Sequence, residues 1–288
     1  MPLTSMAAPP AEAAPPVQAA VPATDWLPGL ELTAGSPKTW LVCFTHAGGT
    51  PTVFRDWPRQ LRDVAQVAPV LLPGRGARIR EPACTELVPL ASQIAAALVA
   101  RGIAANYALF GHSMGALLAY EVGCQLRERG QPEPHHLFVA ASRAPHLYGD
   151  LAMGGLSDTA LRRLVRDIGG LGADEAIGLA YLDRRLPVLR ADLRACEGYQ
   201  WTPRAPLRCP MTAFSAAEDA VASAAQVDAW REYTARSFVR RHLPGGHFVL
   251  ADARCRRLLD ELRAGLSRSR EIPGPPSASP PSDGRKQA

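Results

Sequence analysis

One serine flanked by glycines constrains the fold more than any other feature of this 288-residue chain. Ser113 lies in the run YALFGHSMGALLAY, where an apolar, β-rich stretch ends and a helical apolar pattern begins. This layout predicts a sharp strand-to-helix turn that presents the serine hydroxyl above a sheet as a nucleophile. Gly111 and Gly115 allow the close backbone approach that such a turn needs. Met114, at the start of the helix, is predicted to donate a backbone N–H to a developing oxyanion.

The two ends of the chain differ in composition from its middle. Residues 1–25 are almost wholly Ala, Pro and other small residues, and residues 267–288 are rich in Ser, Pro, Gly and charge. Such segments bury too little apolar surface to offset their ordering entropy, so both are predicted to be disordered tails. Residues 26–266 are long enough to form one domain with a large core.

Strand and helix patterns alternate along this domain. Several predicted strands are nearly continuous apolar runs, as expected for parallel strands buried on both faces. The alternation predicts an α/β fold with a doubly wound, mostly parallel sheet. The predicted strands are 40–45, 67–72, 107–111, 137–141, 211–215 and 238–243, and the predicted helices are 54–64, 87–99, 117–129, 224–233 and 253–266.

Residues 143–204 interrupt the alternation, because they contain helical patterns and no good strand. Ser157 is predicted to cap a helix that runs through Asp167, and Pro187 to open another that includes Leu189. We interpret this insertion, which follows the nucleophile, as a helical lid over the site. The alternative interpretation is an ordinary helical excursion of the scaffold.

A serine nucleophile needs a base, and in this architecture the chain order is Ser, then Asp or Glu, then His. His247, in PGGHFVL, follows the last predicted strand and is placed to hang over the sheet edge. His242 lies within that strand and is expected at the surface, whereas His135 and His136 precede their own strand. His112 adjoins the nucleophile and is expected to point into packing. His247 is therefore the predicted base.

The predicted acid is Asp219, in the loop after strand 211–215 and hence at the same sheet edge. The adjacent Glu218 remains an alternative by spacing, and Asp228 lies inside the next predicted helix. The role of Asp219 would be to fix the tautomer of the imidazole and to stabilise its positive charge.

The loop after the first strand, THAGGT at residues 45–50, is expected to supply a second oxyanion donor. Ala47 is the predicted donor, and Gly48 is the alternative. His46 is expected to brace this loop, although it could also line the pocket.

Charge and cysteine usage exclude several classes of protein. The net charge of +5 comes from scattered arginines without a basic stripe and interleaved aromatics, so nucleic-acid binding is not expected. Six widely spaced cysteines without a CxxC motif indicate structural thiols and no metal site. The N-terminus lacks the basic and apolar regions of a signal peptide, and no apolar run is long enough to span a membrane. We therefore expect a cytoplasmic protein.

Several segments together resemble the type II thioesterases that accompany polyketide and non-ribosomal peptide synthetases, within the α/β-hydrolase superfamily. The resemblance covers about Trp40 to Leu266. The segments that carry it are CFTHAGGT, LPGRGARIREP, GHSMGALLAYEV, LPVLRADLRACEGY, CPMTAFSAAEDAVASAAQVDAWREYT and PGGHFVL. The resemblance implies a triad of Ser113, Asp219 and His247, with oxyanion donors at Met114 and Ala47.

The resemblance also implies a function. An acyl or peptidyl carrier protein would present an acyl thioester on its phosphopantetheine arm, and the enzyme would hydrolyse it to remove stalled or wrong acyl units without a metal or redox cofactor. Two departures from the family pattern are Thr45 and Ala220, where proline is usual, and the second predicts a less firmly oriented Asp219. Alternatives are a general carboxylesterase or lipase, an acyltransferase, and a non-catalytic carrier-binding protein. An arginine-rich lid favours a carrier protein as the partner (Arg162, Arg163, Arg166, Arg184, Arg185, Arg190, Arg194).

Overall fold

The computed structural model describes residues 26–30, 39–149, 153–172, 174–250 and 252–270. The predicted tail at 1–25, and residues 271–288 of the other tail, lie outside the described residues. Helix α9 (Asp252–Arg270) extends past residue 266, so residues 267–270 of the predicted tail are helical. No helix in the described part of the chain has the length and apolarity needed to cross a membrane.

Six parallel strands form one sheet in the order β2-β1-β3-β4-β5-β6. The chain moves from β1 to β2 at one edge, then returns past β1 to β3 and continues to β6 at the other edge. This reversal confirms the predicted doubly wound sheet, and it places a ligand site at the carboxyl ends of β1 and β3. The strands are β1 (Thr39–Phe44), β2 (Ala65–Pro69), β3 (Tyr107–His112), β4 (Leu137–Ala140), β5 (Met211–Ala216) and β6 (Phe238–Leu243).

The prediction for β2, residues 67–72, is displaced from the observed strand. Residues 70–72 are buried but lie beyond the strand. The Val70 N–H still donates to the Cys43 carbonyl of β1 at 2.9 Å, whereas the Leu71 N–H donates to the Trp26 carbonyl at 2.9 Å. Residues 70–72 are therefore apolar because they are buried beside Trp26, and not because they belong to the strand.

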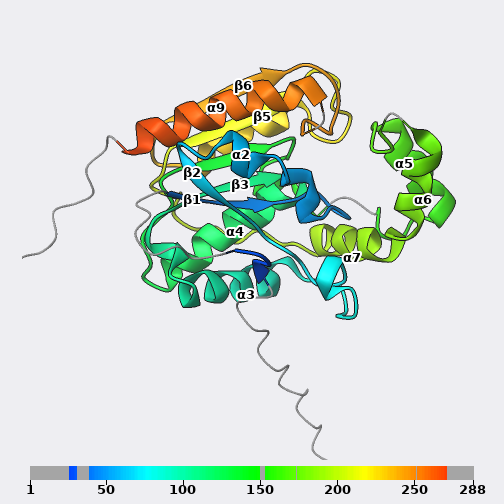
Figure 1. The fold of residues 1–288 in the computed structure, drawn as a ribbon, viewed down its shortest axis with the longest axis horizontal. Coiled ribbons are helices and arrows are strands. Elements are labelled where there is room, and N and C mark those ends of the chain that lie inside the picture. The colour runs from blue at the N-terminus through cyan, green and yellow to red at the C-terminus, as the bar shows by residue number, and fades with distance from the viewer. Residues whose placement is uncertain (1–25, 31–38, 150–152, 173, 251, 271–288) are drawn as a thin grey trace, which may run out of the picture.

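Helices cover both faces of the sheet (Figure 1). Helices α3 (Leu87–Ala100) and α4 (Met114–Glu128) pack on one face, whereas α9 and the short α2 (Trp57–Gln60) lie on the other. Successive side chains along each strand point to opposite faces of the sheet. Val42 joins the core beneath α3 and α4, whereas Leu41 joins the core beneath α9.

Two predicted helices differ from the observed elements. The continuous helix at 54–64 is wrong: η1 (Pro51–Phe54) and α2 form instead. Pro58 lacks an N–H and fits the first turn of α2, so it ends any helix that approaches from the N-terminal side. The helix at 224–233 divides into α8 (Ala224–Asp228) and the 3₁₀ helix η5 (Ala229–Tyr233). The other 3₁₀ helices are η2 (Gly76–Arg78), η3 (Ile103–Ala105) and η4 (Pro145–Leu147).

The insertion between β4 and β5 contains α5 (Asp158–Asp167), α6 (Glu175–Asp183) and α7 (Leu186–Glu197). These helices form a group beside the sheet (Figure 1). The predicted capping is present, because Ser157 Oγ accepts the Ala160 N–H at 3.2 Å, and Pro187 lies in the first turn of α7. Helix α6 is an addition to the predicted elements. We refer to α5–α7 as the lid helices.

Candidate active site

Ser113 occupies a strained turn between β3 and α4. Its φ of 56° and ψ of −123° lie outside the regions that residues with a side chain usually adopt. A Cβ added to Gly111 would lie 2.1 Å from the Gly115 carbonyl oxygen, and one added to Gly115 would lie 2.4 Å from the Phe44 carbonyl oxygen. Neither position has room for a side chain, so the two glycines permit the close crossing of β3, α4 and β1 that holds Ser113 in place.

The structure brings Ser113, His247 and Asp219 together. His247 Nε2 lies 2.9 Å from Ser113 Oγ, and His247 Nδ1 lies 3.0 Å from Asp219 Oδ1 and 3.1 Å from Oδ2. A carboxylate only accepts hydrogen bonds, so Nδ1 carries the proton and Nε2 is free to accept the serine proton. The three side chains therefore form a hydrogen-bonded series of the kind that can activate a serine nucleophile.

Asp219 is held firmly, although Ala220 replaces the family's proline. Its Oδ1 accepts the backbone N–H groups of Val221 at 2.8 Å and Ala222 at 3.1 Å, and its side chain is wholly buried. Burial alone would raise the pKa of Asp219, but the hydrogen bonds from His247, Val221 and Ala222 bring the pKa below its usual value. The adjacent Glu218 is exposed and does not contact His247, so the geometry selects Asp219.

Two further histidines, His46 and His112, lie near His247. His112 Nε2 lies 2.8 Å from the His247 main-chain oxygen, and the rings of His46 and His112 lie 5.2 Å apart. Burial, followed by the charges of His247, Arg185 and Arg75, lowers the pKa of His46 to about 3. Burial likewise lowers the pKa of His112 well below its usual value, so both rings are neutral near pH 7. As expected, His112 packs inward; its bond to the His247 backbone was not predicted.

The residues that carry the two predicted oxyanion donors line the same cavity as Ser113. Met114 is the first residue of α4, so its N–H has no partner within the helix. Within the described part of the chain, the Ala47 N–H makes no hydrogen bond. Gly48, the alternative donor, already gives its N–H to Asp192 Oδ2 at 2.7 Å. The hydrogen bonding therefore favours Ala47 over Gly48.

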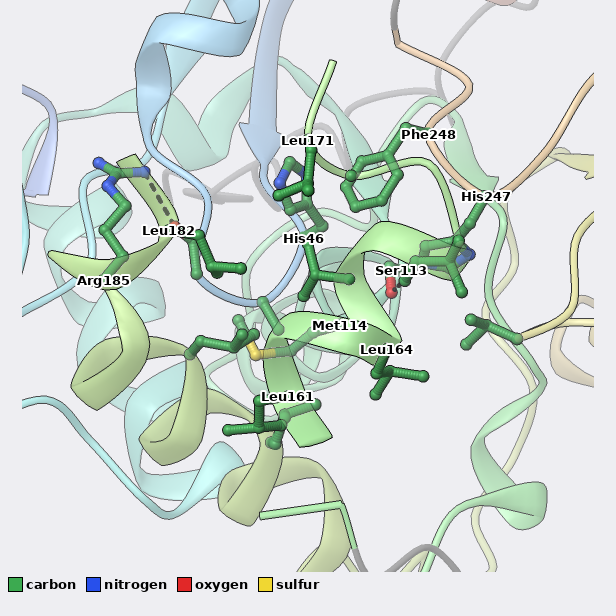
Figure 2. Close-up of a pocket in the computed structure, with 18 of the residues that line it drawn as sticks. His46, Ser113, Met114, Leu161, Leu164, Leu171, Leu182, Arg185, His247 and Phe248 are labelled. Carbon is green, nitrogen blue, oxygen red and sulfur yellow. Dashed lines mark hydrogen bonds between the residues drawn. The ribbon is translucent and has the colours of Figure 1, made fainter. Parts of the chain in front are cut away.

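A largely apolar cavity of about 530 Å³ opens in front of Ser113. Figure 2 shows Ser113, Met114 and His247 among leucines from the lid helices. This volume lies in the usual range for small-molecule sites. The apolar lining includes Leu161, Leu164, Ile168, Leu182, Leu189 and Phe248. Such a cavity can bury an aliphatic chain beside Ser113.

A metal site or a cysteine thiol near the cavity would be an alternative to Ser113. Among the described residues, no group of three or more His, Cys, Asp or Glu side chains is arranged to hold a metal ion. All six cysteines are free thiols. Cys196 does line the cavity, but burial raises the pKa of its thiol well above the usual value, which disfavours the reactive thiolate.

Comparison with known proteins identifies the family. Residues 39–266 match the family described as the thioesterase domain. The chain belongs to the thioesterase family. This thioesterase is 55% identical to the RedJ thioesterase from the prodiginine biosynthetic pathway in Streptomyces coelicolor, with a TM-score of 0.77 over 84% of this chain and 93% of RedJ. It is 31% identical to the type II thioesterase BorB from the borrelidin biosynthetic cluster, with a TM-score of 0.74 over 81% of this chain and 94% of BorB.

A further relative, thioesterase PikA5 of Streptomyces venezuelae, is 35% identical over 217 residues, which cover 74% of this chain and 75% of PikA5. These similarities confirm the α/β-hydrolase fold and the resemblance to type II thioesterases. The protein is a thioester hydrolase.

Sequence reasoning gave no role at the site to three charged side chains, Arg75, Arg185 and Asp192, and counted Arg185 only among the lid arginines. They bond to the loop at residues 45–50, which carries Ala47. One signal was available for Asp192, because it lies at helical spacing from Val188 and Leu189 on the apolar face of α7. A carboxylate in such a position needs a buried partner. The partner itself, 117 residues away, cannot be found from one sequence.

Proposed function

We propose that this thioesterase hydrolyses acyl groups from the phosphopantetheine arm of acyl or peptidyl carrier proteins in natural-product biosynthesis. RedJ and BorB, the solved relatives described above, come from the prodiginine pathway and the borrelidin cluster, which supports this substrate class. The physiological role is editing, the removal of aberrant or stalled acyl units. A cytoplasmic location, where carrier proteins are loaded, remains part of the proposal.

The 2.9 Å contact between His247 Nε2 and Ser113 Oγ carries the proposed mechanism. His247 takes the Ser113 proton while the serine oxygen attacks the thioester carbonyl, and the Met114 and Ala47 N–H groups stabilise the oxyanion. The intermediate collapses, and His247 returns the proton to the departing thiol. A water molecule, deprotonated by His247, then attacks the acyl-serine to release the free acid and restore Ser113.

Asp219 supports both steps, because it keeps the His247 Nδ1 proton in place and stabilises the imidazolium as it forms. The hydrogen bonds that lower its pKa keep it ionised through the cycle. The acyl chain would occupy the apolar cavity beneath the lid helices, where its methylene groups would be removed from water.

The lid arginines give little support for a carrier partner. Several of them are neutralised within the lid, where Arg162 pairs with Asp183, Arg166 with Glu175 and Arg190 with Asp158. The carrier assignment therefore depends on the relatives and on the cavity beside Ser113.

The test compares three substrates of one acyl length: the acylated carrier protein, the acyl-pantetheine thioester, and an oxygen ester. The proposal predicts the highest kcat/KM for the carrier thioester, release of free acid, and loss of turnover with Ser113→Ala. Faster cleavage of the oxygen ester would indicate a general esterase. Transfer of the acyl group to an added alcohol or amine, in place of acid release, would indicate an acyltransferase.

A further inference from the structure

A buried ion pair links the lid to the loop after β2. Arg75 Nη1 and Nη2 lie 2.8 Å and 2.7 Å from Asp192 Oδ2 and Oδ1, and the two side chains are only 4% and 3% exposed. Both charges are therefore removed from water and held in a bidentate arrangement, the geometry in which Arg–carboxylate pairs are strongest. Such a pair often adds little net stability compared with apolar residues. The pair lies against the loop that carries Ala47, so we consider a role in orienting that loop.

The same two side chains bond to the loop at residues 45–50. Asp192 Oδ2 accepts the Gly48 N–H at 2.7 Å, and Arg75 Nη1 donates to the Gly49 carbonyl at 3.2 Å. A third charged side chain, that of Arg185, donates to the Gly48 carbonyl at 2.9 Å. Arg185 is the residue immediately before α7. Figure 2 shows Arg185 reaching toward this loop. Side chains from outside the loop thus bond to the N–H and carbonyl of Gly48 and to the carbonyl of Gly49.

Helix α7 also approaches this loop closely. Gly48 adopts a φ of +73°, and a Cβ added there would lie 3.3 Å from Leu189 Cβ. Asp192 lies about one helical turn after Leu189, so it meets the loop at the same contact. The docked position of α7 and the conformation of Gly48 therefore depend on each other.

This arrangement fixes the direction of the Ala47 N–H. The His46 carbonyl accepts the Gly49 N–H and the Thr45 hydroxyl, both at 2.9 Å. In a trans peptide the C=O and the following N–H point in opposite directions, so the Ala47 N–H must point away from those donors. Holding Gly48 and Gly49 in place keeps the His46 carbonyl bonded and the Ala47 N–H free.

We propose that Asp192, paired with Arg75, is a positioning residue that orients the Ala47 N–H for the oxyanion, so that catalysis requires α7 to be docked on this loop. The proposal rests on the proposed function, in which Ala47 is an oxyanion donor. It makes α7 a fixed part of the catalytic machinery.

Asp192→Asn is the primary test variant. It keeps the size of the side chain but removes its charge, and its amide NH₂ must face either the Gly48 N–H or Arg75, where it has no acceptor. The matched control is Asp183→Asn, which breaks the solvent-exposed Arg162–Asp183 ion pair at 2.6 Å between α5 and α6. A double variant, Arg75→Met with Asp192→Leu, replaces the pair by apolar groups and guards against misfolding from an unpaired buried charge.

Two kinds of measurement separate positioning from stability and from pocket shape. The first is kcat and KM for a carrier-bound acyl thioester, measured well below the Tm of each variant. The second is affinity for an alkyl trifluoromethyl ketone, which forms an oxyanion on Ser113, and for the alcohol of the same chain length, which forms none.

A positioning role predicts that kcat falls about 10- to 100-fold in Asp192→Asn and in the double variant, with little change in KM. Affinity for the trifluoromethyl ketone falls by a similar factor, affinity for the alcohol is unchanged, and Asp183→Asn resembles wild type. A lower Tm with unchanged kcat would overturn the proposal, as would equal losses for ketone and alcohol. Absence of thioester hydrolysis by the wild type would instead refute the proposed function.

Discussion

His112 Nε2 lies 2.8 Å from the main-chain oxygen of His247, so the residue before the nucleophile supports the loop that carries the base. A carbonyl oxygen only accepts hydrogen bonds, so His112 Nε2 carries a proton and donates it. Burial lowers the pKa of His112, and the ring remains neutral. A neutral donor at this position holds His247 without adding a positive charge beside the imidazolium that forms during catalysis.

Replacement of His112 is expected to displace the base. His112→Leu removes the donor, and we expect kcat to fall about tenfold or more, because small displacements of a catalytic group are costly. His112→Gln can still donate to the His247 carbonyl and should retain more of the activity. Steady-state thioester hydrolysis at pH 7 checks this order, and equal losses in the two variants would contradict it.

Asp219 and Glu218 provide a matched pair of carboxylates. Asp219→Asn keeps an oxygen for the Val221 and Ala222 N–H groups but favours the wrong tautomer of His247, so kcat should fall about 10⁴-fold. Glu218→Gln changes an exposed side chain and should leave kcat near the wild-type value. Comparable losses in both variants would remove the distinction that the structure makes between them.

The glycines of α4 differ in how much space they have. In Gly115→Ala the new Cβ would meet the Phe44 carbonyl oxygen at 2.4 Å, so we expect a loss of about 3 kcal/mol in unfolding free energy and loss of activity. Gly123 lies on the same helix, and its added Cβ would lie 3.3 Å from Leu109 Cδ1, a flexible side chain. Gly123→Ala should therefore be tolerated. Urea unfolding of both variants checks this difference.

Buried histidines predict lower stability in acid. Burial lowers the pKa of His136 to about 3, so between about pH 6.5 and pH 3 the unfolded chain binds a proton that the folded chain does not. Unfolding free energy should then fall as the pH falls, by about 1.4 kcal/mol per pH unit for each such histidine.

His136→Gln isolates one contribution to this slope. Glutamine can still bond to Thr212 Oγ1, which lies 2.9 Å from His136 Nε2, and the position is remote from Ser113. The variant should lose about 1.4 kcal/mol less than wild type per pH unit in this range, with unchanged activity at pH 7. Urea unfolding at pH 7 and pH 5 measures the slopes, and an unchanged slope would refute the assignment.

The parts of the fold that sequence predicted correctly are those with local signals. β3, Ser113 and α4 follow one another in the chain, so their residue types reveal the elbow directly. His247 and Asp219 were placed near Ser113 because parallel strands bring their carboxyl ends to one edge. Their contacts in the structure agree with that placement.

The errors arose where one local signal opposed another or where the partner was distant. Phe54, Trp57 and Leu61 have helical spacing and are buried, but Pro58 breaks the helix that their spacing indicates. Helix α6 was missed because Gly178 and weak amphipathicity obscure it, although Asp174 accepts the Ile177 N–H as an N-cap.

The Arg75–Asp192 pair shows what a single sequence cannot supply. Each residue lies in a segment that resembles the family, yet nothing in either segment indicates that the two side chains meet. Their contact depends on how the insertion folds back over the sheet.

Covalent labelling of Ser113 tests the central claim most directly. An alkyl fluorophosphonate reacts with an activated serine, so wild-type protein should be labelled stoichiometrically on the peptide that contains Ser113, as mapped by mass spectrometry. We predict that hydrolysis of the acyl-carrier thioester falls in proportion to the labelled fraction, and that His247→Ala labels much more slowly. Hydrolysis that persists after complete labelling of Ser113 would contradict the account.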